Sequence, residues 1–246
     1  MGLITPSLAL AQTQALGHVQ IAQRNIPAIV AVNVLQKDTS TLTGTGFIIA
    51  PNGLLATNLH LVKDSLYTNV TFSNGVLSGE AELVAQDTKT DLALLKIEAQ
   101  HLPYVTLSTT QPNQVWPGQT ITVIGNPRRL QNTVSSGIIS QLRPQKDGTL
   151  WHQISAPISP SSSGSPVFND QGNVIGVVTA SLAGEGNQNL NFAIPAAYLT
   201  QLVEQAGFTL PVDPTHEAFS QNPFIRHVQK AWQITKRLLH RWYHRE

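Results

Sequence analysis

One histidine, one aspartate and one serine are the residues of this 246-residue chain whose surroundings best suit chemistry. The serine, Ser163, lies in a stretch rich in Ser, Gly and Pro at 158–168, between two apolar segments. Such a stretch buries little surface of its own, leaves backbone N–H groups free, and can present a hydroxyl beside them. Acyl transfer needs this combination of a nucleophile and oxyanion donors. A surface loop is the simpler interpretation when the stretch is taken alone.

The candidate partners of Ser163 are His60, within Thr-Asn-Leu-His-Leu-Val, and Asp91, within Thr-Asp-Leu-Ala-Leu-Leu-Lys-Ile. The chain order His, Asp, Ser is that of the chymotrypsin-type triad and differs from the orders in subtilisin and the α/β-hydrolases. Histidine can take the serine proton as general base and return it to the leaving amine, while aspartate fixes the histidine tautomer. A structural histidine and a capping aspartate at the start of a strand are the alternatives.

Five short sequence blocks, in this order, resemble the HtrA/Deg branch of the trypsin-like serine proteases. The blocks are GTGFII at 44–49, TNLHLV at 57–62, TDLALLKI at 90–97, SSSGSPV at 161–167 and NFAIP at 191–195. Each block alone is a weak signal, but the five together cover most of the chain. The resemblance implies a serine endopeptidase that needs no cofactor, cuts unfolded or exposed polypeptides through an acyl-enzyme, works in protein quality control and forms homotrimers.

The family pattern Pro-Gly-Asn-Ser-Gly-Gly-Pro aligns with the stretch from Pro160 to Pro166 and identifies the nucleophile among several serines. In this register Ser163 is the nucleophile, and the backbone N–H groups of Ser161 and Ser163 form the oxyanion hole. Ser161 replaces a glycine of the family pattern. If the turn needs φ > 0 at this position, the Cβ costs about 1–2 kcal/mol. The peptide could then flip and hold the site inactive until substrate or a partner resets it.

The implied fold also indicates which residues would bind substrate on the acyl side of the cut bond. The pocket would be lined near 156–158, 179–181 and 190–192, and none of these residues is acidic. A pocket that selects Arg or Lys would lack its counter-charge, so we predict a small or aliphatic side chain there. The substrate would pair as an additional strand along 179–181. The predicted substrate-binding residues are Ile158, Thr179, Ala180, Ser181 and Asn191.

Short apolar segments recur at regular intervals with turn residues between them, which is typical of an all-β barrel protein. The resemblance makes this the trypsin-like fold of two six-stranded antiparallel barrels, with a short N-terminal helix and C-terminal helices. The first half predicts strands at 29–35, 45–50, 54–58, 67–72, 80–86 and 92–97. The second half predicts strands at 119–124, 133–142, 150–155, 174–181 and 190–194, while helical spacing occurs at 16–26 and 196–205.

Composition and charge exclude several classes of protein. The chain is 41% hydrophobic and 12% charged, which suits a folded core rather than a disordered chain. A formal net charge of +1 provides no overall field for nucleic acid, so no nucleic-acid partner is expected. The absence of cysteine excludes disulfides, thiolate zinc sites and cysteine nucleophiles. No apolar run reaches the roughly 18 residues of a membrane-spanning helix.

The chain divides into three predicted segments. Residues 1–15 form a flexible start or the remnant of a signal peptide, because Ala9-Leu10-Ala11 resembles a cleavage site but no positive region precedes it. We therefore expect an exported protein, periplasmic or extracytoplasmic, with the cytoplasm as the alternative. Residues 16–210 form the protease domain, and residues 211–246 form a linker and a helix. Too few residues follow 210 for the PDZ module that is usual in the family.

The C-terminal segment 222–246 is predicted to be a basic amphipathic helix. Docking on the barrel, binding of a protein partner and binding of an anionic membrane surface all stay open as its role. His240 and His244 have the i, i+4 spacing of a zinc pair. No carboxylate or third ligand is nearby, so we predict no metal site. The competing class of protein is a catalytically impaired trypsin-fold scaffold that acts through this helix, although all three triad residues are present.

Overall fold

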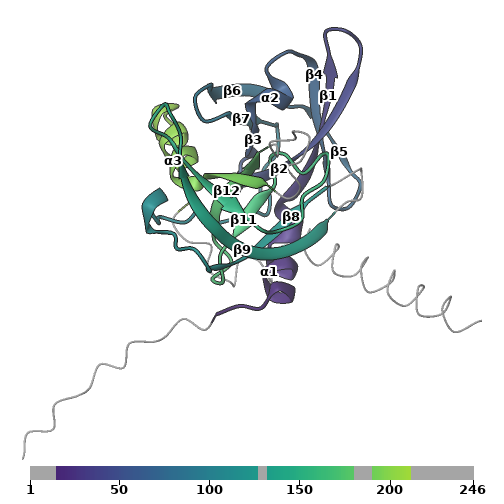
Figure 1. Ribbon diagram of the computed structural model, residues 1–246. Coiled ribbons are helices and arrows are strands. Elements are labelled where there is room, and N and C mark those ends of the chain that lie inside the picture. The colour runs from purple at the N-terminus through teal and green to yellow at the C-terminus, as the bar shows by residue number, and fades with distance from the viewer. Residues whose placement is uncertain (1–14, 127–131, 180–189, 212–246) are drawn as a thin grey trace, which may run out of the picture.

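The computed structural model describes residues 15–126, 132–179 and 190–211, which fold into two β-sheet units (Figure 1). The N-terminal unit, called the first sheet below, contains strands β1 to β7, and the C-terminal unit, called the barrel, contains β8 to β13. The predicted helix at 222–246 lies outside the described residues, as does nearly all of the predicted segment 1–15.

The first sheet is an antiparallel sheet of seven strands in the order β5-β4-β1-β2-β3-β7-β6. A one-turn helix, α2, follows β3, and its position at the end of a central strand matters for the site described below. The elements are α1 His18–Asn25, η1 Ile26–Ala28, β1 Ile29–Gln36, β2 Thr41–Ala50, β3 Leu54–Asn58, α2 Leu59–Val62, β4 Ser65–Phe72, β5 Leu77–Glu80, β6 Glu82–Asp87 and β7 Leu92–Lys96.

The barrel is closed by six strands in the order β10-β13-β12-β11-β8-β9. Closure removes free sheet edges, and β12 in particular is buried along its whole length. The elements are η2 Pro112–Gln114, β8 Thr120–Gly125, β9 Thr133–Pro144, β10 Leu150–Ile154, β11 Pro166–Phe168, β12 Val174–Thr179, β13 Asn191–Pro195 and α3 Ala196–Gln205.

The predicted all-β trypsin-like architecture is confirmed, with one wrong strand in the first sheet and one strand of the barrel that the pattern missed. The single strand predicted over 80–86 is two strands, because the backbone N–H of Ala81 turns aside to donate to the Thr68 carbonyl over 2.7 Å. β5 therefore pairs with β4, whereas β6 pairs with β7 at the opposite edge, giving a curled sheet of seven strands instead of six. In the barrel, β11 has only three residues and was too short to predict.

Two groups of buried apolar side chains form the interior, and the larger group runs from the first sheet into the barrel. It joins Phe47 and Leu94 of the first sheet to Ile124 and Phe168 of the barrel and to Leu199 of α3. Burying one such side chain contributes about 1.5–3 kcal/mol. Because interiors are packed as densely as organic crystals, the two units cannot slide without breaking these contacts. The shared core therefore fixes loops of one unit against strands of the other.

The helices cover the outside of this core. The helix α1 lies across β8, where His18 Nδ1 and Thr122 Oγ1 are 2.7 Å apart, and then leads through η1 into β1. The α-helix ends at Asn25, and the chain passes through Pro27 within η1, with Ile26 still in the right-handed helical conformation. At the other end of the chain, α3 packs Leu199 and Leu202 inward. None of the helices within the described ranges is long and apolar enough to cross a membrane.

One buried histidine in the barrel makes the stability of the fold depend on pH. His152 on β10 is 1% exposed, and its Nε2 donates to the Pro112 carbonyl over 3.0 Å, while its buried Nδ1 has no partner among the described residues. Burial lowers the pKa of His152 below its usual 6.5, and the bond to Pro112 offsets only part of this effect. At pH values just below 6.5 the folded protein therefore keeps His152 neutral, whereas the unfolded chain binds a proton at this residue.

We predict that this linkage destabilises the protein as the pH falls below about 6.5, because the unfolded state then takes up a proton that the folded state refuses. The change His152→Gln retains a donor for the Pro112 carbonyl but removes the titration. Urea unfolding between pH 5 and pH 8 should show a smaller loss of unfolding free energy at acid pH in the variant than in the wild type. Equal pH dependence of the two proteins would contradict this role for His152.

Candidate active site

The histidine and the aspartate of the site come from two neighbouring strands of the first sheet. β3 and β7 pair in register from Leu54–Lys96 to Asn58–Leu92. The residues just beyond the end of β3 therefore lie beside the residues just before β7. His60, in α2 directly after β3, and Asp91, directly before β7, meet for this reason. The prediction that the strand at 54–58 delivers His60 matches the structure.

Hydrogen bonds to the Asp91 carbonyl fix the backbone where β3 ends and β7 begins. The N–H of Leu59 and the side-chain amide of Asn58 both donate to the Asp91 carbonyl, over 3.0 and 3.1 Å. Asp91 itself has φ of 56°, a left-handed conformation that aspartate tolerates better than most residues. Its backbone is thus turned so that the carboxylate returns toward α2.

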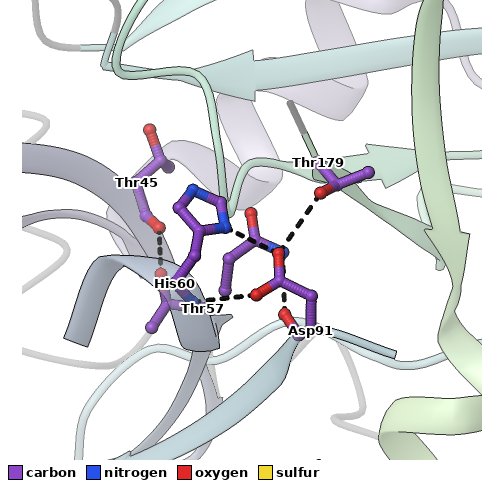
Figure 2. A network of polar contacts seen from close by, with 6 residues as sticks. Thr45, Thr57, His60, Asp91 and Thr179 are labelled. Atoms are coloured by element: carbon purple, nitrogen blue, oxygen red, sulfur yellow. Dashed lines mark hydrogen bonds and ion pairs between the residues drawn. The ribbon is translucent and has the colours of Figure 1, made fainter. Parts of the chain in front are cut away.

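The Asp91 carboxylate uses both oxygens to hold His60 (Figure 2). Oδ2 lies 2.6 Å from His60 Nδ1, and Oδ1 accepts from the His60 backbone N–H over 2.8 Å. Because the carboxylate can only accept, Nδ1 carries the proton of the ring and neutral His60 has its free lone pair on Nε2. The two side chains are 38% and 28% exposed, so the contact orients the ring in a partly solvated setting.

A third donor to this carboxylate comes from the barrel. Thr179 Oγ1, at the end of β12, donates to Asp91 Oδ2 over 3.3 Å and so joins the barrel to the histidine–aspartate pair (Figure 2). The sequence predicted Thr179 only as part of the substrate-binding strand. Its contact with Asp91 had no signal in the sequence, because the two residues are 88 positions apart.

The serine stretch folds into two consecutive turns. Ser162 N–H donates to the Ser159 carbonyl over 2.9 Å across Pro160 and Ser161, and Ser161 has φ of 75°. Proline followed by a residue with φ > 0 is the pattern of a type II turn, which favours glycine at the second place. The condition under which a Cβ at Ser161 would be strained is therefore met in this structure.

Some backbone N–H groups of this stretch form hydrogen bonds with described residues and others do not. The N–H groups of Ser162, Gly164 and Ser165 donate to backbone carbonyls. Within the described residues, those of Ser161 and Ser163 donate to none. These are the two N–H groups that the resemblance assigns to the oxyanion hole, and they are available to a ligand.

The stretch is attached to the first sheet through Thr45 of β2. Thr45 N–H donates to the Ser163 carbonyl over 2.9 Å, and Thr45 Oγ1 donates to the Ser161 carbonyl over 2.9 Å. Gly164 has φ of 86°, and a Cβ there would collide with the Thr45 carbonyl, so only glycine allows this approach. Ser163 thus reaches the boundary where His60 and Asp91 lie, although in the described part of the chain no hydrogen bond joins its hydroxyl to the His60 ring.

The predicted substrate-binding residues are only partly covered by the structure. Ile158 is half-buried against the smaller core group of the barrel. Asn191 is 5% exposed, and its side-chain amide donates to the Ala156 carbonyl over 2.8 Å. Asn191 therefore reaches from β13 across to the segment that follows β10. Ala180 and Ser181 lie outside the described residues.

The described residues hold no group of three or more His, Asp or Glu side chains arranged to bind a metal ion. The histidine pair considered in the sequence, His240 and His244, lies outside them. The groups that the structure brings to the boundary are an oriented imidazole, a serine hydroxyl and backbone N–H groups that donate to no backbone carbonyl of the described residues.

Comparison with known proteins assigns the family. The family model described as a trypsin-like peptidase domain matches residues 44–177, which is more than half of the chain. The chain therefore belongs to the trypsin-like peptidases. Its relatives are of the HtrA type, as the following similarities show.

Two curated relatives illustrate the similarity in sequence. A probable periplasmic serine endoprotease DegP-like from Chlamydia pneumoniae is 38% identical over 167 residues, which are 66% of this chain and 34% of that protein. The putative serine protease HhoB from Synechocystis sp. is 40% identical over 161 residues, which are 62% of this chain and 37% of that protein. The chain thus spans about a third of the length of these relatives.

Two solved structures illustrate the similarity in fold. The serine endoprotease from Yersinia pestis aligns with a TM-score of 0.67 and 33% identity, over 78% of this chain and 67% of that chain. The HtrA-type protease AlgW with a tripeptide aligns with a TM-score of 0.69 and 30% identity, over 78% of this chain and 65% of that chain. The fold similarity therefore includes both the first sheet and the barrel.

Ser165 shows a cost of the serine-rich stretch that can be measured. It is fully buried, and its hydroxyl has no hydrogen-bond partner among the described residues. Gly125 lies against it, since a Cβ at Gly125 would collide with Ser165 Oγ. A buried unpaired hydroxyl typically costs about 1–3 kcal/mol relative to an apolar group.

We predict that Ser165→Ala raises the free energy of unfolding by about 1 kcal/mol, because it removes that hydroxyl without creating a large cavity. The matched control is Ser162→Ala, since Ser162 is also buried but its hydroxyl accepts from the Ser159 N–H over 3.1 Å. The control should lower the free energy of unfolding. Urea titration measures both, and a destabilised Ser165→Ala would contradict the assignment of an unpaired hydroxyl.

Proposed function

We propose that this protein is a serine endopeptidase that hydrolyses peptide bonds of unfolded or exposed polypeptides through His60, Asp91 and Ser163. The observation that carries the proposal is the two-point contact between the Asp91 carboxylate and His60, which leaves His60 Nε2 as a free base. The unused N–H groups of Ser161 and Ser163 and the membership of the trypsin-like peptidases support the same reaction.

The mechanism follows from these groups. His60 Nε2 takes the proton of Ser163 as Oγ attacks the peptide carbonyl carbon, and positioned proton transfer of this kind contributes roughly 10²–10⁴-fold. The resulting oxyanion accepts from the N–H groups of Ser161 and Ser163, each such donor being worth about 2.7–4 kcal/mol in the transition state. His60 then returns the proton to the leaving amine, and an acyl-enzyme on Ser163 remains.

The second half of the reaction uses the same groups in reverse. Water takes the place of the amine, gives its proton to His60 Nε2 and attacks the acyl carbon. The oxyanion is held again by the same two N–H groups, and collapse of the intermediate returns the proton to Ser163 Oγ. Asp91 keeps the tautomer of the imidazole and stabilises the imidazolium throughout. Catalytic hydrogen bonds are often long in unliganded enzymes and tighten with substrate, which fits the absence of a bond between His60 and Ser163 here.

Location, organisation and partners complete the proposal. Relatives named periplasmic support an exported location, with the cytoplasm as the alternative. A role in protein quality control is proposed from the resemblance to the HtrA/Deg proteases alone. We propose residues 16–210 as the protease domain and residues 211–246 as a linker and basic helix. The proposed partners are polypeptide substrates, further copies in a homotrimer, and a protein or an anionic membrane surface that binds 222–246.

We predict that Ser163→Ala lowers kcat/KM on a peptide substrate by about 10⁴-fold or more, because the nucleophile of a triad cannot be replaced by its neighbours. A fluorophosphonate probe should label the wild-type protein and fail to label the variant. Ser136→Ala, which changes an exposed serine on β9, is the control and should be labelled like the wild type.

Two results would contradict this proposal. Labelling of Ser163→Ala at the wild-type rate would place the nucleophile elsewhere. A wild-type protein that neither reacts with the probe nor digests casein would favour the catalytically impaired scaffold that acts through 222–246.

A second prediction concerns substrate preference and depends on Asn191. Its buried side chain bridges β13 and the Ala156 carbonyl, between two predicted walls of the acyl-side pocket. We propose that this amide limits the pocket to small or aliphatic side chains. Asn191→Gly removes the whole side chain and should raise kcat/KM for a Phe peptide relative to the matched Ala peptide by at least roughly 10-fold, since even one methylene in a pocket is worth about 10–200-fold. An unchanged Phe-to-Ala ratio would exclude Asn191 from this role.

A further inference from the structure

Thr45 of the first sheet forms two hydrogen bonds to the serine stretch. It lies on β2, it is fully buried, and all three of its polar groups form hydrogen bonds. In the sequence, the block that contains Thr45, at 44–49, indicates only the family resemblance. The contacts of Thr45 indicate a more specific role.

The hydroxyl of Thr45 has a defined direction. The backbone N–H of Asn126, just after β8, donates to Thr45 Oγ1 over 3.0 Å. Because that contact uses a lone pair, the hydroxyl proton is directed to the Ser161 carbonyl, 2.9 Å away. The hydroxyl therefore acts as acceptor and donor at once, and a methyl group in its place would leave two buried polar groups unpaired.

The contacts of Thr45 hold two peptide units of the serine stretch. The unit between Ser161 and Ser162 is bound at its carbonyl by Thr45 Oγ1 and at its N–H by the Ser159 carbonyl. The unit between Ser163 and Gly164 is bound at its carbonyl by Thr45 N–H and at its N–H by the Val178 carbonyl over 2.9 Å. Peptide planes held at both ends cannot rotate, so the backbone on either side of Ser163 is fixed.

The third polar group of Thr45 leads toward the base. Its carbonyl accepts from Thr57 Oγ1 over 2.7 Å, and Thr57 lies on β3, three residues before His60 (Figure 2). One residue therefore contacts both the backbone that carries the nucleophile and the strand that carries the base. A small shift at Thr45 would change the distance between Ser163 and His60 and the direction of the free N–H groups together.

We propose that Thr45 is a positioning residue for catalysis, whose hydroxyl fixes the Ser161–Ser162 peptide unit and, through it, the direction of the flanking Ser161 and Ser163 N–H groups. This inference rests on the proposed function, since it concerns the same nucleophile and the same oxyanion donors. It assigns the role to the hydroxyl and leaves to the methyl group only the filling of space.

The test compares Thr45→Val, which keeps the shape and loses the hydroxyl, with Thr45→Ser, which keeps the hydroxyl. Thr45→Val should lower kcat on a peptide substrate by roughly 10- to 100-fold with KM nearly unchanged, because misplacement by about 1 Å costs up to 10²-fold. Thr45→Ser should recover most of the loss. Thr68→Val is the matched control, because Thr68 is buried on β4 of the same sheet and its hydroxyl has no partner among the described residues. The control should keep the kcat of the wild type.

Amide hydrogen exchange tests the positioning separately from the chemistry. In Thr45→Val the amide of Ser162 should exchange roughly fivefold faster than in the wild type, the equivalent of one net hydrogen bond. The amide of Gly164 should keep the wild-type rate, because the backbone N–H of Thr45 still binds its peptide unit. In Thr45→Ser both amides should exchange at the wild-type rate. This measurement applies to the folded protein even if the wild type proves inactive, so it separates failure of this inference from failure of the proposed function.

The inference is overturned if Thr45→Val keeps both the wild-type kcat and the wild-type exchange of the Ser162 amide. It is also overturned if Thr45→Ser loses as much kcat as Thr45→Val, because the methyl group would then be the important part. If Thr68→Val lowers kcat as much as Thr45→Val does, the effect comes from a general loosening of the sheet, and the inference is also overturned.

Discussion

The close approach of the serine stretch to β2 is the contact on which the rest of the site depends. Gly164 has no side chain, and this lets the barrel backbone reach the Thr45 carbonyl and the Thr57 hydroxyl of the first sheet. The shared core from Phe47 to Phe168 holds the two units rigidly enough for hydrogen bonds of 2.9 Å to form between them. Without that contact the two halves of the site would belong to separate sheets with no common geometry.

The two halves are built by different means. The positions of His60 and Asp91 are set by strand pairing, because the end of β3 lies beside the start of β7. The Asp91 carbonyl is hydrogen-bonded to Asn58, and its carboxylate is hydrogen-bonded to His60. The serine stretch consists of turns until β11 begins at Pro166, so its conformation depends on Thr45, on the Val178 carbonyl and on its own turn bonds. Regular pairing therefore provides the rigid half of the site, and loop contacts provide the half that is easier to alter.

The serines that replace family glycines act on this second half. Ser161 holds φ of 75° with a Cβ, and Ser165 buries a hydroxyl without a partner in the described residues. Each feature raises the free energy of the folded stretch relative to a glycine-containing one, by an amount on the order of 1 kcal/mol. Both costs fall beside Ser163, the proposed nucleophile, and stored strain clusters at functional sites.

Local patterns in the sequence were sufficient to predict the all-β class and most strands, and the resemblance to the HtrA/Deg proteases indicated His60, Asp91 and Ser163 as candidates. Local patterns failed where the structure of a segment depends on the residues with which it pairs elsewhere in the chain. The segment 80–86 became two strands because its two ends pair with opposite edges of the sheet. The contacts of Thr179 with Asp91 and of Thr45 with Ser161 join residues 88 and 116 positions apart. Periodicity reports which side of an element is buried, whereas hydrogen bonds across a boundary depend on how two finished units pack, and only the tertiary structure determines that packing.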